Sequence, residues 1–284
     1  MGSLSGKVVV VTGASRGVGR GIAFALGAEG ATVYVTGRTV TPGAHELGGS
    51  IGETAKEVTG RGGRGVAVQL DLANDEAIAD LFERIRVEQG RLDILVNNAI
   101  AYPPEITAAK PFWQRPLADW EMIDIGLRSY YVAAWHAAQI MIPQKSGLMA
   151  ATSGYIARTY ALSVIFGVCK TGVDRMARDM AIELKPHKVA SVSLWQGFTY
   201  TDRTAQGVKS APSLTSQLHS ASGSSPEFPG RIIAALAKDP HLMDRTGGTF
   251  INAELGQEYG VTDIDGRMVP SLRGERGAPI FGPV

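Results

Sequence analysis

The sequence predicts an α/β protein with a doubly wound parallel sheet in a single domain spanning residues 1–284. Two observations predict this fold class. Short apolar runs alternate with segments of helical periodicity from the first residues onward, and a glycine-rich turn follows the first apolar run. Strands and helices that alternate in this way form right-handed βαβ units, whose strands are parallel.

The predicted strands are short and apolar. The first, at 7–12, is rich in valine and unbroken, as is typical of a strand buried on both faces of a parallel sheet. Further strands are predicted at 32–36, 65–70, 93–96, 147–152, 189–194 and 249–253.

The predicted helices show an apolar face. In the segment 74–88 the residues Ile78, Leu81 and Ile85 share one face, and Asn74 fits an N-cap. Further helices are predicted at 16–29, 117–142 and 163–184.

Two stretches interrupt this alternation. Residues 196–226 are rich in Ser, Thr and Gly, and a weakly periodic loop of that length predicts a lid. Residues 263–284 are rich in Gly, Pro and Arg, which predicts an extended tail. The core of the domain is therefore expected at about 5–255.

Composition excludes several classes of partner. The chain has 28 basic and 27 acidic residues, so its charge gives no reason to expect nucleic acid or an anionic membrane. The single cysteine, Cys169, excludes an internal disulfide and fits a reducing compartment. The first residues lack the features of a signal peptide, and no apolar run reaches the roughly 20 residues that span a bilayer. We therefore expect a cytoplasmic protein that acts on a small molecule and holds no metal.

The glycine-rich turn TGASRGVG lies between the first predicted strand and the first predicted helix, with glycines at 13, 17 and 19. Glycine permits a positive φ and lets the backbone approach a ligand closely. The helix that follows offers free amide groups and its positive dipole end to a pyrophosphate. This context distinguishes the turn from an ordinary tight turn and predicts a dinucleotide site.

With this TGxxxGxG spacing the chain resembles the short-chain dehydrogenase/reductase family, whose fold is Rossmann-like. The resemblance continues through Asp71-Leu72, Asn97-Asn98-Ala99, Ser153, Lys170 and the region of Gly197, and it covers about residues 5–255. It implies that Asp71 and Leu72 flank the adenine and that Ala99 lies beside the adenosine ribose. The two asparagines also fit a structural turn that holds the sheet together.

The residues expected to bind the cofactor come from the glycine turn and from the family motifs. They are Gly13, Ser15, Arg16, Gly17, Val18, Gly19, Arg38, Asp71, Leu72, Asn98, Ala99, Lys170, Thr199 and Thr201.

The end of the second strand favours NADP(H) over NAD(H). An acid at that place would accept hydrogen bonds from the ribose hydroxyls, but here Gly37 stands there and Arg38 follows. A guanidinium can hold a 2′-phosphate with two hydrogen bonds, and Arg16 adds a second positive charge on the same side. Either arginine alone also fits a solvated surface residue.

The resemblance implies an Asn-Ser-Tyr-Lys catalytic set, in which tyrosine transfers the proton, lysine lowers its pKa and serine orients the carbonyl. Ser153 and Lys170 match the set. Phe166 stands where the tyrosine is expected, and Gly126 aligns with the asparagine. A phenyl ring has no exchangeable proton, so the proton-transfer half of the site is altered.

Another tyrosine could replace the missing phenol. Tyr155 is the first candidate, and with Ser153 and Lys170 it completes the predicted catalytic residues; Tyr160 and Tyr102 are weaker candidates. Each tyrosine also fits a packing aromatic. A second hypothesis is that Phe166→Tyr raises turnover, because its ring edge is expected to face the cleft.

The remaining aromatic residues leave the substrate open. They flank the expected cleft and indicate either a bulky apolar substrate or ordinary core packing. Cys169 and His136 are interpreted as packing residues. The aromatics in question are Phe112, Trp113, Trp195, Phe198 and Tyr200.

Three functions fit this sequence. The first is an NADP(H)-dependent oxidoreductase of carbonyls or alcohols with altered or weak catalysis, and the second is an NADP(H)-binding pseudoenzyme that acts as a sensor or partner subunit. The third is an enzyme of the same fold that needs no phenol, such as one that reduces an activated double bond. The resemblance also implies a homodimer or homotetramer that pairs the helices at 117–142 and 163–184, whose second member carries Val173, Met176, Ala177 and Met180 at helical spacing.

Overall fold

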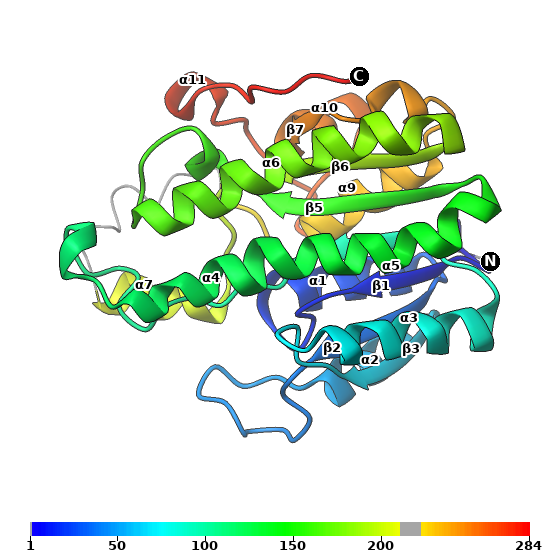
Figure 1. Ribbon diagram of the computed structural model, residues 1–284, viewed down its shortest axis with the longest axis horizontal. Helices are drawn as coiled ribbons and strands as arrows, with labels where there is room; N and C mark the ends of the chain where they lie inside the picture. Colours follow the sequence, from blue (N-terminus) through cyan, green and yellow to red (C-terminus); the bar gives the residue numbers. More distant parts are fainter. Residues whose placement is uncertain (1, 211–222) are drawn as a thin grey trace.

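Seven parallel strands form one sheet in the computed structural model, which describes residues 2–210 and 223–284 (Figure 1). The strand order is β3-β2-β1-β4-β5-β6-β7, so the α/β fold with a doubly wound parallel sheet is confirmed. The strands are β1 (Val8–Val11), β2 (Thr32–Gly37), β3 (Arg64–Gln69), β4 (Ile94–Asn97), β5 (Gly147–Ser153), β6 (Val189–Trp195) and β7 (Thr249–Ile251).

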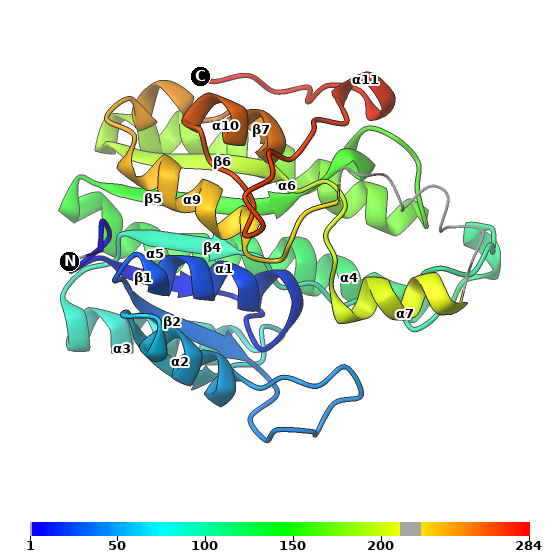
Figure 2. The same ribbon diagram turned by 180° about the vertical axis from the view of Figure 1, so that it is seen from behind.

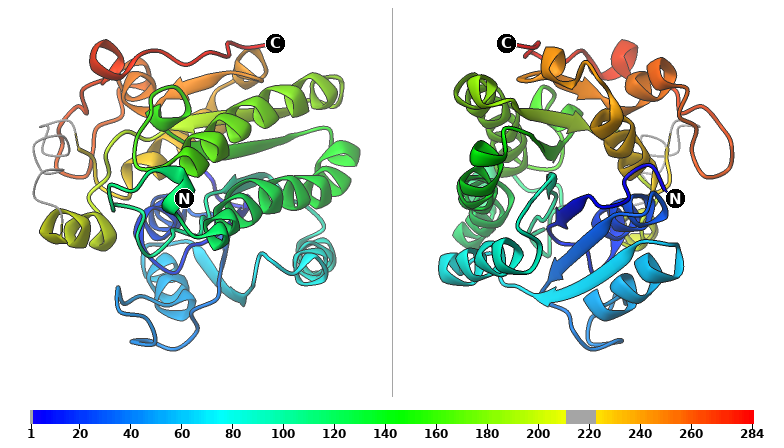
Figure 3. Two further views of the ribbon diagram at one scale, coloured as in Figure 1. Left: turned by 60° about the vertical axis from the view of Figure 1, so that its left-hand side comes forward. Right: turned by 90° about the vertical axis from the view of Figure 1, so that its right-hand side faces the viewer.

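Helices cover both faces of the sheet, as the two views in Figure 3 show. One face carries α1 (Gly17–Ala28), α2 (Ile51–Gly60) and α9 (Phe228–Lys238), and α10 (Asn252–Tyr259) packs on α9. The other face carries α3 (Asp75–Gln89), α5 (Ser129–Gln144) and α6 (Val164–Leu184). Within residues 2–210 and 223–284, no helix combines the length and apolar character that crossing a bilayer requires.

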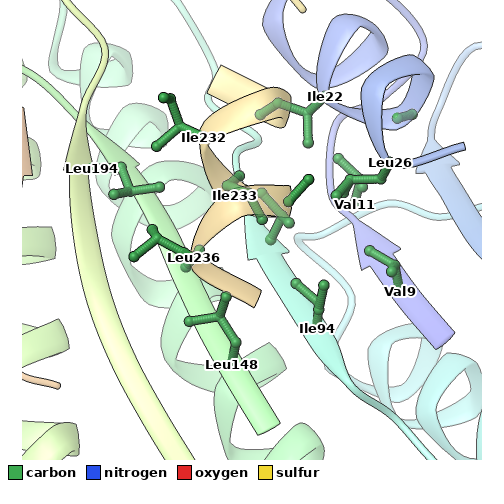
Figure 4. Packing of buried hydrophobic residues seen from close by; sticks show 14 of the residues in the cluster. Val9, Val11, Ile22, Leu26, Ile94, Leu148, Leu194, Ile232, Ile233 and Leu236 are labelled. Atoms are coloured by element: carbon green, nitrogen blue, oxygen red, sulfur yellow. The ribbon is translucent and has the colours of Figure 1, made fainter. Parts of the chain in front are cut away.

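The two faces of the sheet bury two separate apolar cores. Alternate residues of a strand point to opposite faces, so Val9 and Val11 of β1 join one core while Val8 and Val10 join the other. Figure 4 shows the first core, where Val11 lies near Ile22 of α1. This double burial explains why the first strand is a continuous valine run.

All seven strands lie within one or two residues of their predicted positions, but several helices do not follow from the sequence pattern. Helices α2 and α9 were not predicted. The last strand was expected to reach Ala253, yet it ends at Ile251 and α10 begins at Asn252. Helix α2 begins because the Ser50 hydroxyl accepts a hydrogen bond from the Glu53 amide at 3.2 Å, a local N-cap.

The stretch expected to be a lid contains a helix, α7 (Asp202–Ser210), and a bridge between Thr199 and Ser224 returns the chain to the sheet end. Residues 211–222 of the expected lid lie outside the described residues. A lid function for the stretch therefore stays a prediction.

The segment predicted as an extended tail is packed against the sheet. It contains one helical turn, α11 (Arg273–Arg276), and then runs along the edge strand β7 (Figure 1). The Thr249 amide donates to the Phe281 carbonyl at 2.9 Å, and the Val284 amide donates to the Thr246 carbonyl at 2.9 Å. The C-terminal segment thus covers an edge that would otherwise expose unpaired backbone groups.

The long helix predicted at 117–142 is interrupted. A 3-10 turn (Leu117–Trp120) and α4 (Glu121–Ile123) lead into a π-helical segment (Asp124–Arg128) before α5 begins. A β-carbon on Gly126 would lie 2.8 Å from the Cys169 sulfur, and that thiol donates to the Met122 carbonyl at 3.7 Å. The absence of a side chain at Gly126 therefore makes room for the Cys169 thiol at the π-helical segment.

We expect Gly126→Ala to destabilise the protein by about 1–3 kcal/mol through overpacking. The cost should be smaller in a Cys169→Ala background, because the clashing sulfur is then absent. Urea unfolding of the two single variants and the double variant measures this coupling.

The matched control is Gly52→Ala on α2, where a β-carbon would meet no atom within 4 Å. That change should stabilise the helix by about 0.5–1 kcal/mol. Equal costs of Gly126→Ala in both backgrounds would contradict the proposed fit.

Candidate functional site

The site residues gather at the carboxyl ends of β1 and β4, two strands that are neighbours in the sheet but not in sequence. The chain leaves these strands toward opposite faces, and ligands of open α/β sheets bind in the crevice at that point. Figure 2 shows α4, α7 and the loop after β2 projecting at this end of the molecule.

The glycine turn meets the end of β4 at close range. Gly13 has a φ of +65°, and a β-carbon there would lie 2.8 Å from the Ala99 α-carbon. At Gly19 a β-carbon would lie 2.4 Å from the Gly13 carbonyl oxygen and 2.5 Å from the Asn98 amide nitrogen. The predicted residues Gly13, Gly19, Asn98 and Ala99 are therefore brought together, and the contacts require glycine.

Hydrogen bonds lock the same junction. The Thr12 hydroxyl accepts from the Asn98 and Ala99 amides at 2.9 and 3.2 Å, and the Asn98 side chain donates to the Thr12 carbonyl at 3.0 Å. The Asn97 side chain donates to the Tyr130 carbonyl at 3.1 Å. Asn98 thus joins the ends of β1 and β4, and Asn97 ties the end of β4 to α5. Thr12, which completes this junction, did not follow from the sequence pattern.

The junction fits a dinucleotide. Arg16 occupies the N-cap position of helix α1, but its side chain accepts no hydrogen bond from the helix. The first-turn amides of α1 therefore face the crevice without a side-chain acceptor. Thr201 lies beside the turn, since a β-carbon on Gly17 would be 3.8 Å from its γ-carbon. The Thr199 hydroxyl is buried and makes no hydrogen bond within the described part of the chain. Uncapped amides and an orphaned buried hydroxyl are what a bound pyrophosphate and nucleotide would satisfy.

The other residues expected to bind the cofactor differ in how far they are buried. Ser15 is buried, and Val18 packs against the core on the sheet face of α1. Leu72 is buried, and the exposed Asp71 caps its own turn by accepting from the Ala73 amide at 3.1 Å. Arg38 is exposed at the end of β2.

Positive charge collects between the turn and the loop after β2. The Arg16 guanidinium donates to the Gly48 carbonyl at 2.8 Å and to the Thr39 hydroxyl at 2.7 Å. Burial, followed by the charges of Arg203 and Arg38, lowers the pKa of Arg16. Arg203 comes from α7 and belongs to no motif, so the sequence pattern gave no sign of its place in this cluster.

Ser153 and Lys170 are brought together by the end of β5 and the buried face of α6. The Lys170 ammonium donates to the Thr152 carbonyl at 2.9 Å, and the Ser153 hydroxyl donates to the Lys170 carbonyl at 3.3 Å. Burial lowers the pKa of Lys170, while the nearby Cys169 and Asp174 act in the opposite direction. A buried ammonium with one neutral acceptor can still bind ligand hydroxyls.

Phe166 lies in a small apolar cluster with Met122 and Cys169 and is only 6% exposed. Its ring meets the Tyr102 ring edge to face, with centroids 5.7 Å apart. The ring edge is thus covered, not open to a cleft as the sequence suggested. A hydroxyl added at position 166 would enter apolar surroundings and would need a hydrogen-bond partner there.

Tyr155 does not join Lys170. Its hydroxyl accepts from the Leu272 amide at 3.2 Å, and its ring packs against Trp195 with centroids 5.0 Å apart. Burial raises the pKa of Tyr155. This placement favours the packing role that the sequence left open over the role of substitute acid.

The remaining candidate side chains are either exposed at the surface or packed against other residues. Tyr160 is exposed on the outer side of α6, His136 stacks on Phe82, and Cys169 is fully buried. Among the cleft aromatics, Trp195 belongs to the core, whereas Phe112 and Trp113 are exposed and Phe198 packs edge to face with Tyr200. The substrate-binding role of these aromatics stays a prediction.

Comparison with known proteins agrees with this geometry. The family model for short chain dehydrogenases matches residues 7–211. The mouse protein dehydrogenase/reductase SDR family member 1 is 38% identical over 276 residues, which cover 94% of this chain and 86% of that protein. The human protein of the same name is also 38% identical, with the same coverage.

Solved structures show the same architecture. A dehydrogenase from Xanthomonas campestris superimposes with a TM-score of 0.78 at 22% identity and covers 95% of this chain and 94% of its own. A structure described as an NAD(P)-dependent gluconate 5-dehydrogenase from Beutenbergia cavernae, with NADP bound at low occupancy, has a TM-score of 0.75 at 27% identity and covers 88% and 96%. On the family match and the extent of the mouse and human similarity, the chain belongs to the short-chain dehydrogenase/reductase family.

Proposed function

We propose that the protein is an NADP(H)-dependent oxidoreductase that interconverts a carbonyl and an alcohol, with slow or altered proton transfer. The observation that carries the choice of NADP(H) is the gathering of Arg16, Arg38 and Arg203 beside the glycine turn. A 2′-phosphate would neutralise this cluster, whereas a ribose hydroxyl would leave its mutual repulsion in place. A relative of known structure that binds NADP supports the proposal.

Lys170 and Ser153 have different roles in the proposed reaction. A bound nicotinamide cofactor supplies or accepts the hydride. The Lys170 ammonium can hold ribose hydroxyls, and Ser153 can donate to a substrate carbonyl once its hydroxyl turns from the Lys170 carbonyl. A positioned general acid is worth about 10²–10⁴ in rate, so an oxidoreductase without the phenol at 166 would carry about 3–5 kcal/mol of extra barrier.

A second function is favoured by the surroundings of Phe166. The ring is sealed among apolar side chains, and Gly126 is packed against Cys169, so neither position offers an exchangeable proton. An NADP(H)-binding sensor or partner subunit, or a reductase of activated double bonds, would not need one.

The charge cluster predicts that NADPH binds at least about tenfold more tightly than NADH, which corresponds to about 1.4 kcal/mol. Arg38→Asp should invert the preference, because a carboxylate repels the 2′-phosphate and accepts from ribose hydroxyls. Fluorescence titration of both cofactors measures the two dissociation constants. Equal constants in the unmutated protein would refute the assignment.

Arg64→Asp serves as the matched control. Arg64 is an exposed arginine at the start of β3, the opposite end of that strand from the crevice. The substitution makes the same charge change and should leave the cofactor preference unaltered.

We also propose a homodimer or homotetramer, with a correction to its surface. Val173 and Ala177 of α6 are buried against the sheet and cannot form the interface. The outward face instead carries Val168, and α5 presents Trp135, both about half exposed. Beside Val168 the surface is hollowed by about 520 Å³. A second copy of this chain would cover these apolar side chains.

Trp135→Asp and Val168→Asp should each shift the protein toward the monomer, because a carboxylate buried in the interface would lose its hydration without gaining a partner. Light scattering at micromolar concentration should give at least twice the 30.0 kDa chain mass for the unmutated protein. Val87→Asp, at an exposed valine on α3, is the control and should change nothing. A single 30.0 kDa species in the unmutated protein would contradict the proposal.

A further inference from the structure

Reduction of a carbonyl needs a proton as well as a hydride. The hydride adds to the carbonyl carbon, the π bond's electron pair moves to oxygen, and an acid O–H bond breaks as the new alcohol O–H bond forms. Since Phe166 has no such bond to break, another proton donor at the carboxyl ends of the strands has to supply the proton if the proposed function holds, and a phenol is the group that matches the missing one.

Most hydroxyls near the site already have a partner. The Ser153 hydroxyl donates to the Lys170 carbonyl, and the Tyr155 hydroxyl accepts from the Leu272 amide. The Tyr130 hydroxyl lies 3.5 Å from the Thr152 hydroxyl inside a fully buried cluster. The Ser153 and Tyr130 hydroxyls cannot meet a substrate without first breaking a contact or opening the core, and the Tyr155 ring is held against Trp195 with its hydroxyl at the C-terminal segment.

Tyr102 differs from them. Its side chain is partly buried, and within residues 2–210 and 223–284 its hydroxyl makes no hydrogen bond. The oxygen is also absent from the fully buried polar atoms that lack a partner. An unpartnered phenol held by a packed ring is the form that a proton donor needs.

The position of Tyr102 matches that use. It follows β4 by five residues, at the crevice end of the sheet, and its ring packs at 84° on Phe166 with centroids 5.7 Å apart. The Arg203 guanidinium lies over the Tyr102 ring, 5.0 Å from its centroid. Phe166 thus supports the ring, and Arg203 places a positive charge beside it.

We propose that Tyr102 donates the proton to the substrate oxygen, and that Arg203 stabilises the phenolate that remains. The phenol is supplied from the loop after β4, and Phe166 serves as the apolar platform that orients it. Solvent returns the proton to the phenolate after each turnover.

The charges around Tyr102 fit the reductive direction. Burial raises the pKa of Tyr102, and the charge of Arg203 opposes that rise. The phenol is therefore protonated at neutral pH, and the positive charge limits the cost of ionising it during proton transfer.

The direct test is Tyr102→Phe, which removes the hydroxyl and keeps the ring on Phe166. With NADPH as the hydride source and a set of aliphatic and aromatic aldehydes and ketones, we expect kcat to fall about 10²–10⁴-fold. The dissociation constant for NADPH should stay within about twofold, because only an interaction made in the transition state is lost. The control is Tyr259→Phe, which removes the phenol of α10 that donates a hydrogen bond to Asp239. This variant should keep full turnover.

Arg203 gives a second readout that a purely structural tyrosine would not produce. In Arg203→Met the loss of positive charge should raise the pKa of the phenol, so the alkaline fall of kcat/KM moves to higher pH. Arg203→Lys keeps the charge and should keep the profile. This comparison also decides the matter if Tyr102→Phe folds poorly.

The outcomes separate this assignment from the function on which it rests. Turnover in Tyr102→Phe within about threefold of the unmutated protein overturns the assignment and leaves the oxidoreductase proposal intact. Unmutated protein that binds NADPH but reduces none of the carbonyls overturns both. A large loss of kcat in Tyr102→Phe, with NADPH binding kept and full turnover in Tyr259→Phe, supports both.

Discussion

The hydrogen bonds from the Asn98 and Ala99 amides to the Thr12 hydroxyl are the contact on which the rest of the site depends. They join the ends of β1 and β4, the two central strands, at the place where the chain turns to opposite faces of the sheet. The junction is so close that only glycine fits at position 13. Because the turn is held from both strands, the amides of α1 are fixed toward the crevice before any ligand arrives.

The two halves of the site respond differently to sequence change because they use different parts of the residues. The cofactor half is formed largely by backbone amides and by the absence of β-carbons, so it survives as long as the glycines do. The proton-transfer half needs particular side-chain atoms. In this chain Phe166, Gly126 and Cys169 pack as one apolar unit, and a hydroxyl introduced there would have to be matched by its neighbours.

The C-terminal segment extends this dependence to distant residues. Its backbone pairs with β7, and the Leu272 amide donates to the Tyr155 hydroxyl across 117 positions of sequence. The Arg273 guanidinium also contacts Glu254 of α10. The segment therefore takes up the Tyr155 phenol near the crevice, so packing at the edge of the sheet influences which side chains the site can use.

The sequence by itself determined the seven strands, their parallel arrangement and the glycine turn, because these follow from local runs, alternation and the special conformations of glycine, whereas the order of the strands came from the structure. The family resemblance also placed Ser153 and Lys170 in one expected site. Only the tertiary structure decided which face of α6 is buried, since both faces of that helix carry apolar residues. It also decided the partners of the tyrosines. A side chain's contacts depend on segments far away in the chain. Examples are the Leu272 amide, which donates to the Tyr155 hydroxyl, and the Arg203 guanidinium, which lies over the Tyr102 ring, and no local pattern encodes those encounters.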